Sequence, residues 1–395
     1  MRILAYLMKV GHPALLDNMM SLASALSNMG HTVRLCDVNN PDETRDVLCS
    51  IAEDPNCFDM SIGFNGLGLE WNFVEYTDMV YLYEALTFPH VSVMLDEPFN
   101  HCVSGYDLPC KNHIVTYLDR SDLQALDILY PDKKMRKLFM PLGGSLQPDV
   151  SDPFSGPKEY DVVVSAGNWV AGTSAPRWHQ EGTAKPIVAV LDDVADVLMH
   201  YPVGLLTAFQ EVLYARGMYD REYLKALAPY FWPVLQFIKP WRRHQMVQCL
   251  VEAGFQVHIY GGGWENVSFH DALIDHGVVP YRQMLDVISK TKVLVQDEAL
   301  FNDGAHDRVF TGMLNGAVVV SEYSSYLDEL FEDRQDMFMF DWQHTKEQME
   351  VIHQLLEDEQ YRANIARNAY GKVIKSQTWA NRAERIMETV EIFKE

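Results

Sequence analysis

Residues 302–322, NDGAHDRVFTGMLNGAVVVSE, restrict the possible fold of the chain more than any other segment. A polar turn that contains glycine precedes a short helical pattern, in which apolar residues recur at helical spacing over 309–314. Asn315-Gly316 ends the helix, and an apolar strand follows at once over 317–320. A helix joined this closely to a buried strand predicts one repeating unit of a parallel α/β sheet.

The same alternation of strand and helix continues along most of the chain. Predicted strands lie at 3–8, 32–38, 60–64, 91–95, 113–118, 138–140, 161–166, 257–260, 293–296 and 318–321. A segment rich in Pro, Gly, Ser and Asp separates two such series at 149–159 and is typical of a linker. The sequence therefore predicts two α/β domains, and the interdomain cleft that they form is a favoured place for a ligand.

Composition and charge exclude several classes of function. The formal net charge is -23, which argues against nonspecific nucleic-acid binding and against docking on an anionic membrane. The basic segments 133–137 and 239–243 are interpreted as solvated helix or loop faces. No apolar run has the length of a membrane span, and the first residues resemble a strand more than a signal peptide. We expect a cytoplasmic protein with no integral membrane segment.

The start of the helix within 302–322 is the first candidate site. It carries His306, Asp307 and Arg308, and a helix start presents free backbone N–H groups and a positive dipole end. We expect Arg308 and the loop N–H groups to hold a diphosphate, while nearby acidic or amide groups hold sugar hydroxyls. The alternative is a helix that Asp303 or Asp307 merely caps.

Two further segments follow predicted strands of the second half. Gly261, Gly262 and Gly263 come directly after a strand and allow a close approach of the backbone to a ligand. Asn168 follows the first strand of the second series and faces the cleft if that sheet is parallel. Both segments are also consistent with ordinary turns that bind nothing.

Candidate residues of the first half also lie at strand ends. Asp96 and Glu97, with His101 nearby, could supply a general base, and Asp119 is a similar case after the next strand. His12 follows the first strand. Ordinary surface loops remain the alternative for each of them. The spacing of His101, Cys102, Cys110 and His113 matches no zinc motif, so no metal site is predicted.

At GAHDRVF (304–310) and MLNGA (313–317) the sequence resembles the spore-maturation-protein glycosyltransferase-like family, a branch of the group-1 glycosyltransferases. The resemblance continues through 324–327 and 378–382, and it is fainter at 96–98, 119–120 and 141–144.

The resemblance implies an α/β fold of GT-B architecture, with two Rossmann-like domains facing a cleft. The acceptor domain would cover 1–150 and the nucleotide-sugar donor domain 151–375, with a helical insertion at about 185–240. A terminal helix at 376–395 would cross back to the N-terminal domain.

The implied function is transfer of a sugar from a nucleotide-diphosphosugar to a glycan, protein or small-molecule acceptor. This transferase would need no metal and no cofactor besides its co-substrate. Alternatives are a catalytically silent nucleotide-binding protein and a sugar-nucleotide epimerase.

The resemblance also assigns roles to individual residues. In the family a Glu stands where this chain has Thr311, and Asp303 is placed to bind a sugar hydroxyl. Tyr281 is a candidate contact for the nucleobase. Asp96 or Glu97 would be the base of an inverting transfer that Arg308 assists, whereas in a retaining transfer they would only position the acceptor. The predicted donor-binding residues are Asn168, Gly261, Gly262, Gly263, Tyr281, Asp303, Gly304, Ala305, His306, Asp307, Arg308, Val309 and Thr311. The predicted acceptor-side residues are His12, His101 and Asp119.

Overall fold

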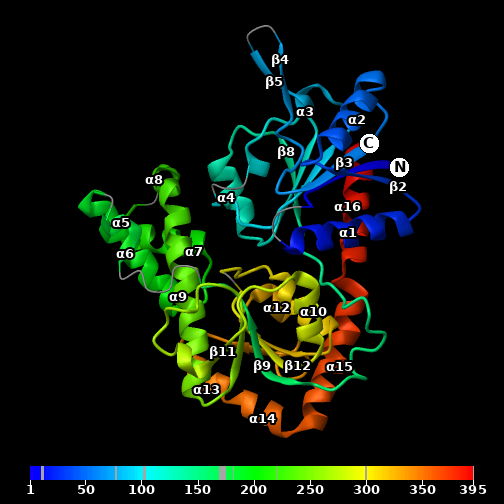
Figure 1. The fold of residues 1–395 in the computed structure, drawn as a ribbon. Coiled ribbons are helices and arrows are strands. Elements are labelled where there is room, and N and C mark those ends of the chain that lie inside the picture. Colours follow the sequence, from blue (N-terminus) through cyan, green and yellow to red (C-terminus); the bar gives the residue numbers. More distant parts are fainter. Residues whose placement is uncertain are drawn as a thin grey trace. The chain divides into compact units, whose positions relative to one another are not determined.

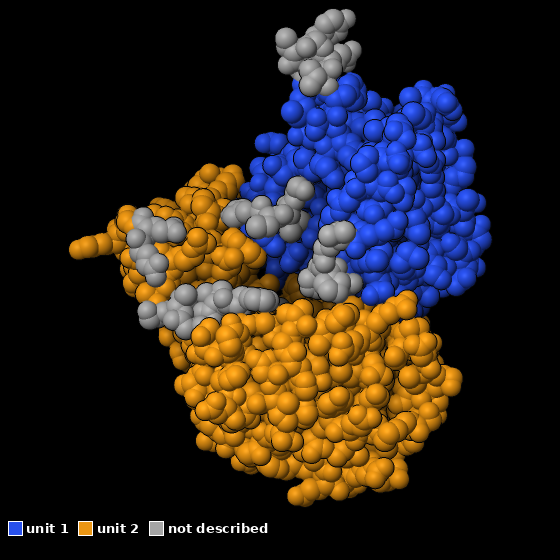
Figure 2. Space-filling model, viewed as in Figure 1, with its two compact units in different colours: residues 1–143, 377–395 blue, residues 144–376 orange. Residues whose placement is uncertain are grey.

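The structure is a computed structural model that describes residues 1–9, 13–75, 78–100, 104–168, 175–180, 182–218, 220–298 and 300–394. Two compact units make up the chain (Figure 2). Unit 1 contains Met1–Gly143 and Gln377–Glu395, and unit 2 contains Gly144–Ser376. The chain thus passes between the units after residues 143 and 376, where the sequence predicted boundaries after 150 and 375. The candidate residues His12 and His101 lie outside the described residues.

Unit 1 is built on a six-stranded sheet with the strand order β2-β1-β3-β6-β7-β8 (Figure 1). All five strand pairs are parallel. The strands are β1 (Arg2–Leu7), β2 (Thr32–Asp37), β3 (Met60–Phe64), β6 (His90–Val93), β7 (His113–Tyr117) and β8 (Met135–Phe139). The helices are α1 (Pro13–Asn28), α2 (Pro41–Glu53), α3 (Leu82–Ala85), α4 (Asp122–Leu129) and α16 (Trp379–Lys394), with a 3₁₀ turn at Ser104–Tyr106.

The C-terminal helix α16 belongs to unit 1, where it packs against α1 (Figure 1). Arg382, which is 5% exposed, fixes its start. Its Nε donates to the Pro141 carbonyl at 2.6 Å, and its Nη2 donates to Gln377 Oε1 at 2.6 Å. The Trp379 ring lies 5.8 Å from the ring of Phe64 at the end of β3. These buried contacts tie the end of the chain to the first sheet.

Unit 2 contains a second six-stranded sheet with the order β11-β10-β9-β12-β13-β14. Its strands are also parallel: β9 (Tyr160–Ser165), β10 (Val257–Tyr260), β11 (Leu273–Asp275), β12 (Thr291–Gln296), β13 (Val318–Glu322) and β14 (Phe338–Phe340). The helices that follow the first strands are α5 (Arg177–Gln180), α6 (Lys185–His200), α7 (Leu205–Ala215), α8 (Arg221–Leu227), α9 (Phe231–Glu252) and α10 (Tyr281–Ser289). The later helices are α11 (Asp307–Leu314), α12 (Ser325–Leu330), α13 (Thr345–Met349), α14 (Val351–Glu357) and α15 (Glu359–Ser376), and 3₁₀ turns lie at Ala228–Tyr230 and His270–Ala272.

Both faces of the second sheet are covered, as its continuous apolar strands require. Val162, Val257, Val293 and Val318 point to the face that packs against α9 and α14 and are fully buried. Helices α10 and α11 contact the sheet at β12, and α11 also contacts β13. At Gly312 of α11 an added Cβ would lie 2.7 Å from Leu294 and 2.8 Å from Val319, so glycine allows α11 to pack closely on the strands.

The predicted helical section contains α6, α7 and α8 and continues into α9 (Figure 1). Its helices pack through apolar side chains, including the rings of Phe209 and Phe231, whose centroids are 4.6 Å apart. Helix α9 is long enough to reach from this section to the second sheet, and Pro240 lies inside it.

The two parallel sheets confirm the predicted α/β fold class. Four short strands were not predicted from the sequence. Strands β4 (Asn72–Glu75) and β5 (Asp78–Tyr81) form an antiparallel hairpin that extends away from the first sheet in Figure 1, and the other two are β11 and β14. Each of these strands has only three or four residues, which is too short for a clear periodic pattern.

Candidate functional site

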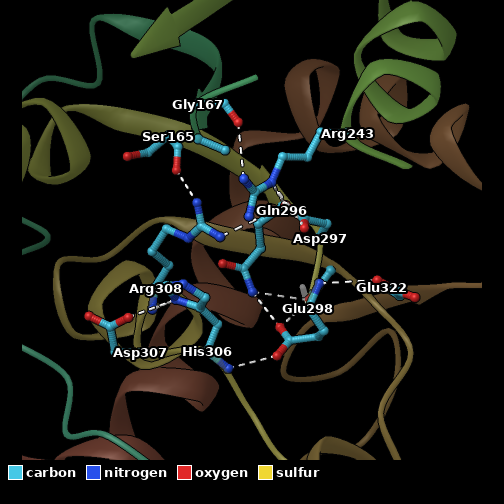
Figure 3. Close-up of polar contacts among 12 residues, drawn as sticks. Ser165, Gly167, Arg243, Gln296, Asp297, Glu298, His306, Asp307, Arg308 and Glu322 are labelled. Atoms are coloured by element: carbon cyan, nitrogen blue, oxygen red, sulfur yellow. Dashed lines mark hydrogen bonds and ion pairs between the residues drawn. The ribbon is translucent and has the colours of Figure 1, made fainter. Parts of the chain in front are cut away.

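The candidate site lies in unit 2, where β9 and β12 end side by side in the parallel sheet (Figure 3). The last residue of β9 supplies the Ser165 carbonyl, and the chain after this strand supplies that of Gly167. The chain after β12 supplies Asp297 and Glu298. Ligands of open parallel sheets bind at the carboxyl ends of the strands. Helix α9 adds Arg243 to this edge, and the first turn of α11 adds Arg308.

Arg308 occupies the centre of the group. Its Nη1 donates to the Ser165 carbonyl, and its Nη2 lies 3.8 Å from Asp297 Oδ1. The side chain is only 14% exposed. Among the described residues, no group accepts a hydrogen bond from its buried Nε or Nη2. Burial lowers the pKa of Arg308, while the charge of Asp297 opposes that shift. A buried donor without a partner is costly, so these two N–H groups are suited to a ligand that brings acceptor atoms.

Asp297 holds a second arginine next to the first. Arg243 Nε lies 2.9 Å from Asp297 Oδ1 and 3.1 Å from Oδ2, while Arg243 Nη1 donates to the Gly167 carbonyl at 3.0 Å. Burial alone would raise the pKa of Asp297, but the charges of Arg243 and Arg308 outweigh it and hold that pKa at about 2. Asp297 is therefore ionised at neutral pH and lies between two cations.

Glu298 organises the loop that leads from β12 to α11. Its buried carboxyl group accepts hydrogen bonds from the His306 backbone N at 2.7 Å and from Ser321 Oγ at 2.8 Å, and Gln296 Nε2 also contacts it. Its own backbone N donates to Glu322 Oε2 at 3.2 Å. Burial raises the pKa of Glu298, while its hydrogen bonds with His306 and Ser321 oppose that shift. The carboxyl acts as a structural bridge within the loop.

His306 and Asp307 form a close pair at the start of α11. His306 Nδ1 lies 2.7 Å from Asp307 Oδ1 and 3.3 Å from the Arg308 backbone N. One ring nitrogen cannot donate and accept at the same time, and the shorter contact assigns the N–H to Nδ1. Because burial lowers the pKa of His306, the ring is neutral, and its Nε2 is left as an acceptor.

Asn168 and the three glycines lie together beside the arginines. The Asn168 backbone N donates to the Gly262 carbonyl at 2.8 Å. The Asn168 side chain is fully buried, and neither its Nδ2 nor its Oδ1 has a hydrogen-bond partner within the described parts of the chain. A Cβ added to Gly261 would lie 2.3 Å from the Ala166 carbonyl oxygen, so only glycine fits there. Trp264 Nε1 donates to the same carbonyl at 2.8 Å.

The remaining residues of the 302–311 loop mostly serve its internal structure. The Gly304 carbonyl accepts from Ser324 Oγ at 2.6 Å, and Asp303 Oδ1 accepts from Ser325 Oγ at 2.7 Å. Ala305 is 1% exposed and Val309 is fully buried. These contacts place Asp303, half-buried, near the site and place the apolar side chains in the core.

Thr311 packs inside unit 2. It is 2% exposed, and its Oγ1 accepts from the Ser145 backbone N at 3.2 Å. The hydroxyl keeps its own hydrogen as a donor, and the donor contact expected of Thr311 stays a prediction. Tyr281 is the first residue of α10 and is half-buried, with its hydroxyl in the interior.

The predicted residues of the first half form a separate group at the carboxyl ends of the strands of unit 1. Asp96 follows β6, and its Oδ2 accepts from Asn65 Nδ2 at 3.2 Å. Glu97 is 4% exposed. Asp119 follows β7, where its Oδ1 accepts from the Ser121 backbone N at 2.8 Å and from Ser121 Oγ at 2.6 Å.

The structure corrects two expectations about the donor side. The N–H groups of the loop and helix start were expected to be free for a ligand, but that of His306, the residue before α11, is bonded to Glu298. The basic segment 239–243 was interpreted as a solvated face, yet Arg242 and Arg243 are 2% and 17% exposed in their side chains and form ion pairs. Long-range carboxylates, which local spacing does not predict, draw both arginines inward.

Asp297 and Glu298 were not predicted as site residues. Their signal was present, because two adjacent acidic residues directly follow the predicted strand 293–296. Within the described ranges, no cluster of three or more His, Cys, Asp or Glu side chains is arranged to hold a metal ion. No helix in the described part of the chain is both long and apolar enough to cross a membrane.

Residues 242–388 match a protein family described as glycosyl transferase-like. The match contains both arginines, Asp297 and all of α11, and it covers less than half of the chain. No curated protein shows significant similarity to the sequence.

Solved glycosyltransferases show the same fold over nearly the whole chain. Sucrose-phosphate synthase from Thermosynechococcus elongatus superposes with a TM-score of 0.55 and 11% identity, covering 99% of this chain and 98% of that one. A DNA-modifying β-glucosyltransferase gives 0.55 and 12%, covering 99% of each chain. The T4 phage β-glucosyltransferase gives 0.50 and 11%, covering 97% of this chain and 98% of that one. These similarities confirm the predicted GT-B fold with its two Rossmann-like domains, and at such low identity they show the fold alone.

Proposed function

We propose that this chain is a glycosyltransferase that moves a sugar from a nucleotide-diphosphosugar donor to a glycan, protein or small-molecule acceptor. The observation that carries the proposal is the Arg308 guanidinium, which is 14% exposed and has two buried N–H groups with no acceptor among the described residues. Arg243 lies on the other side of Asp297. A diphosphate offers the acceptor oxygens and the negative charge that suit two guanidinium groups.

The proposed chemistry uses these cations on the leaving group. An acceptor oxygen forms a bond to the anomeric carbon, while the bond from that carbon to the diphosphate breaks and its electron pair goes to the diphosphate. Preorganised cations in a site of low dielectric stabilise the charge that develops. Because Arg243 and Arg308 supply that positive charge, we propose that neither a metal ion nor another cofactor takes part.

The sugar and the nucleobase would contact other parts of the same edge. The Asn168 amide, which has no hydrogen-bond partner among the described residues, and the acceptor Nε2 of His306 are suited to sugar hydroxyls, as is Asp303. Tyr281 remains the proposed contact for the nucleobase. The β-glucosyltransferase to which this chain is similar was solved with and without its substrate uridine diphosphoglucose, which supports a nucleotide sugar as the ligand class. The narrower resemblance to the spore-maturation-protein family remains a prediction.

The test is a thermal-shift screen of the purified chain against UDP, GDP, ADP, CDP and their common hexose conjugates. A ligand that binds only the native state raises the melting temperature by mass action, so the screen names the nucleobase. The best donor is then incubated with candidate acceptors. We expect one nucleoside diphosphate to shift the melting temperature and its sugar to be transferred. A chain that no nucleotide stabilises would contradict the proposal.

A non-catalytic nucleotide-binding role is the second candidate, and Thr311 favours it. The resemblance places a Glu at this position, whereas Thr311 has no carboxylate and its hydroxyl accepts a hydrogen bond from the Ser145 backbone N. Tight binding of a nucleoside diphosphate, with no transfer to any acceptor, would support this role. Turnover of the nucleotide sugar without an acceptor would instead indicate an epimerase.

A further inference from the structure

Asp297 lies between the two arginines of the candidate site, although both arginines already have other partners that hold them in position. The guanidinium of Arg243 already donates to the Gly167 carbonyl, and that of Arg308 already donates to the Ser165 carbonyl. Each arginine therefore has its own backbone anchor at the end of β9. The Asp297 carboxylate, 1% exposed, adds a negative charge at the point that the two cations share.

The contacts of Asp297 with the two arginines are unequal. Arg243 Nε is within hydrogen-bond distance of both carboxylate oxygens, at 2.9 and 3.1 Å. Arg308 Nη2 is 3.8 Å from Oδ1, which is an ion pair without a hydrogen bond. The carboxylate thus lowers the positive potential around Arg308 but leaves its Nε and Nη2 available to an incoming acceptor.

Charges of both signs lie close together at the site. Arg243 and Arg308 contribute two positive charges, Asp297 contributes one negative charge, and Asp307 contributes another, because its interactions with His306 and Arg308 overcome burial and lower its pKa. His306 is neutral. A pair of arginines without a resident anion would hold a diphosphate far more strongly, since charge attraction in a buried site is only weakly screened.

We propose that Asp297 is a resident counter-anion, which competes with the diphosphate for Arg308 and Arg243 and so limits how tightly the site retains its nucleoside diphosphate product. This inference rests on the proposed function, because only a transferase needs to release a nucleoside diphosphate product. An enzyme whose product stays bound turns over slowly, and product release often limits the rate. Asp297 stabilises the arginine pair when no ligand is bound, and it lowers the affinity of the same pair for the diphosphate.

The first test compares Asp297→Asn with the wild-type chain, using inorganic pyrophosphate as the probe in calorimetry. Asparagine has the same shape and can still accept from Arg243 Nε, so the main change is the lost charge. We expect about tenfold tighter binding of pyrophosphate or more, equivalent to about 1.4 kcal/mol. The melting temperature without anions should fall, and the increase that pyrophosphate causes should grow.

A matched control is Asp336→Asn. Asp336 is 3% exposed and is paired with Lys372. It precedes β14, so it lies at the amino-terminal ends of the parallel strands, whereas the candidate site lies at their carboxyl ends. Its replacement also removes a buried negative charge next to a cation. We expect it to lower the melting temperature and to leave pyrophosphate affinity within twofold of wild type.

A double-mutant cycle separates competition from positioning. If Asp297 only positions Arg243, then Asp297→Asn has no effect on pyrophosphate affinity once Arg243→Gln is present. If Asp297 competes for Arg308, Arg243→Gln alone loses most of the pyrophosphate affinity. The double variant Arg243→Gln/Asp297→Asn then binds pyrophosphate at least fivefold more tightly than Arg243→Gln. Asp297→Asn alone leaves the buried Arg243 without its carboxylate, whereas the double variant removes both members of the pair. If Asp297→Asn alone fails to fold, the double variant still allows the comparison with Arg243→Gln.

Equal or weaker pyrophosphate binding by the folded Asp297→Asn and by the double variant, each relative to its parent, would overturn the inference. This outcome is distinct from failure of the proposed function. A wild-type chain that transfers sugar, together with an Asp297→Asn variant that binds no tighter, would refute only the counter-anion role. Tighter pyrophosphate binding without turnover of any nucleotide sugar would refute only the transferase.

Discussion

Arg242 and Glu322 form an ion pair in which the two side chains are only 2% and 4% exposed. The same guanidinium donates to the carbonyls of Leu198 at 2.6 Å and Tyr201 at 2.9 Å, at the end of α6. Glu322 also accepts from Trp342 Nε1 at 2.6 Å and from the Glu298 backbone N at 3.2 Å. The pair therefore connects the helical section to the loop that precedes α11.

Replacing Arg242 should strongly destabilise unit 2. Arg242→Met leaves Glu322 buried without its cation and leaves two carbonyls without their donor, which should cost about 3–5 kcal/mol. Denaturant unfolding measures the loss. Lys225→Met, which breaks an exposed pair with Glu222, is the control and should cost less than about 1 kcal/mol. Comparable losses in the two variants would show that the buried pair is not specially important.

Arg308→Ala should remove binding of the nucleoside diphosphate and keep the fold. The side chain provides two buried N–H groups and a positive charge, and losing such charged hydrogen bonds should weaken binding about 100-fold or more. Calorimetry with the nucleotide from the thermal-shift screen measures the change. The exposed Arg45→Ala is the control for arginine loss as such. Unchanged affinity in Arg308→Ala would refute the assigned role.

The proposed base in unit 1 is tested by separating turnover from binding. If Asp96 takes the proton of the acceptor in an inverting transfer, Asp96→Asn should lower kcat about 100-fold or more. The dissociation constant of the donor should stay within about twofold, since a base is needed only in the chemical step. Asp107→Asn, at an exposed carboxylate paired with Lys133, should change neither value. Parallel losses of kcat and donor affinity would argue against a catalytic role for Asp96.

Gly261 should tolerate no side chain. An added Cβ would lie 2.3 Å from the Ala166 carbonyl oxygen, at a φ of 152°. Gly261→Ala should therefore cost about 3 kcal/mol or more and weaken nucleotide binding by moving the backbone that contacts Asn168. Gly254→Ala is the matched control, because Gly254 has a φ of 88° but no atom within 4 Å of an added Cβ. That variant should cost only about 1 kcal/mol. Equal costs would mean that backbone strain, and not the close contact, dominates at Gly261.

The stability of unit 1 should fall as the pH decreases below about 6.5. His113 contacts Ser92 Oγ at 2.8 Å, and burial lowers its pKa to about 4. His90 contacts Ser61 Oγ at 2.9 Å, and burial lowers its pKa as well. Below the ordinary histidine pKa of about 6.5, the unfolded chain takes up protons that the folded chain does not, so stability declines.

The decline due to His113 should reach about 2 kcal/mol at pH 5 and level off below its folded pKa of about 4. Urea unfolding at pH 7 and pH 5 measures it, in a range where most carboxylates stay ionised. His113→Asn removes the titrating group and should reduce the difference between the two pH values. An unchanged difference would assign the acid sensitivity to other groups.

Much of the fold follows from local patterns in the sequence. The alternation of apolar runs with helical segments predicted ten strands of the two sheets, and 302–322 contains the loop, α11 and β13 that it was expected to contain. The short hairpin β4–β5 and strands β11 and β14 lacked such a pattern. Arg308 was expected to bear a charge at a helix start, and α11 does begin at Asp307. Periodicity and turn residues act within a few positions of the chain, so local sequence is sufficient for these features.

The environment of each charged group was decided only by the tertiary structure. Arg243 was expected in solvent, because nothing near it in sequence indicates Asp297, which is 54 residues away. The Thr311 hydroxyl accepts a hydrogen bond from the backbone of Ser145, 166 residues away, and nothing near Thr311 in sequence indicates that partner. The free energy of a buried charge or hydroxyl depends on which partners share its desolvated space. Those partners come together only when the strands align, whereas helix and strand formation can already be predicted from neighbouring residues.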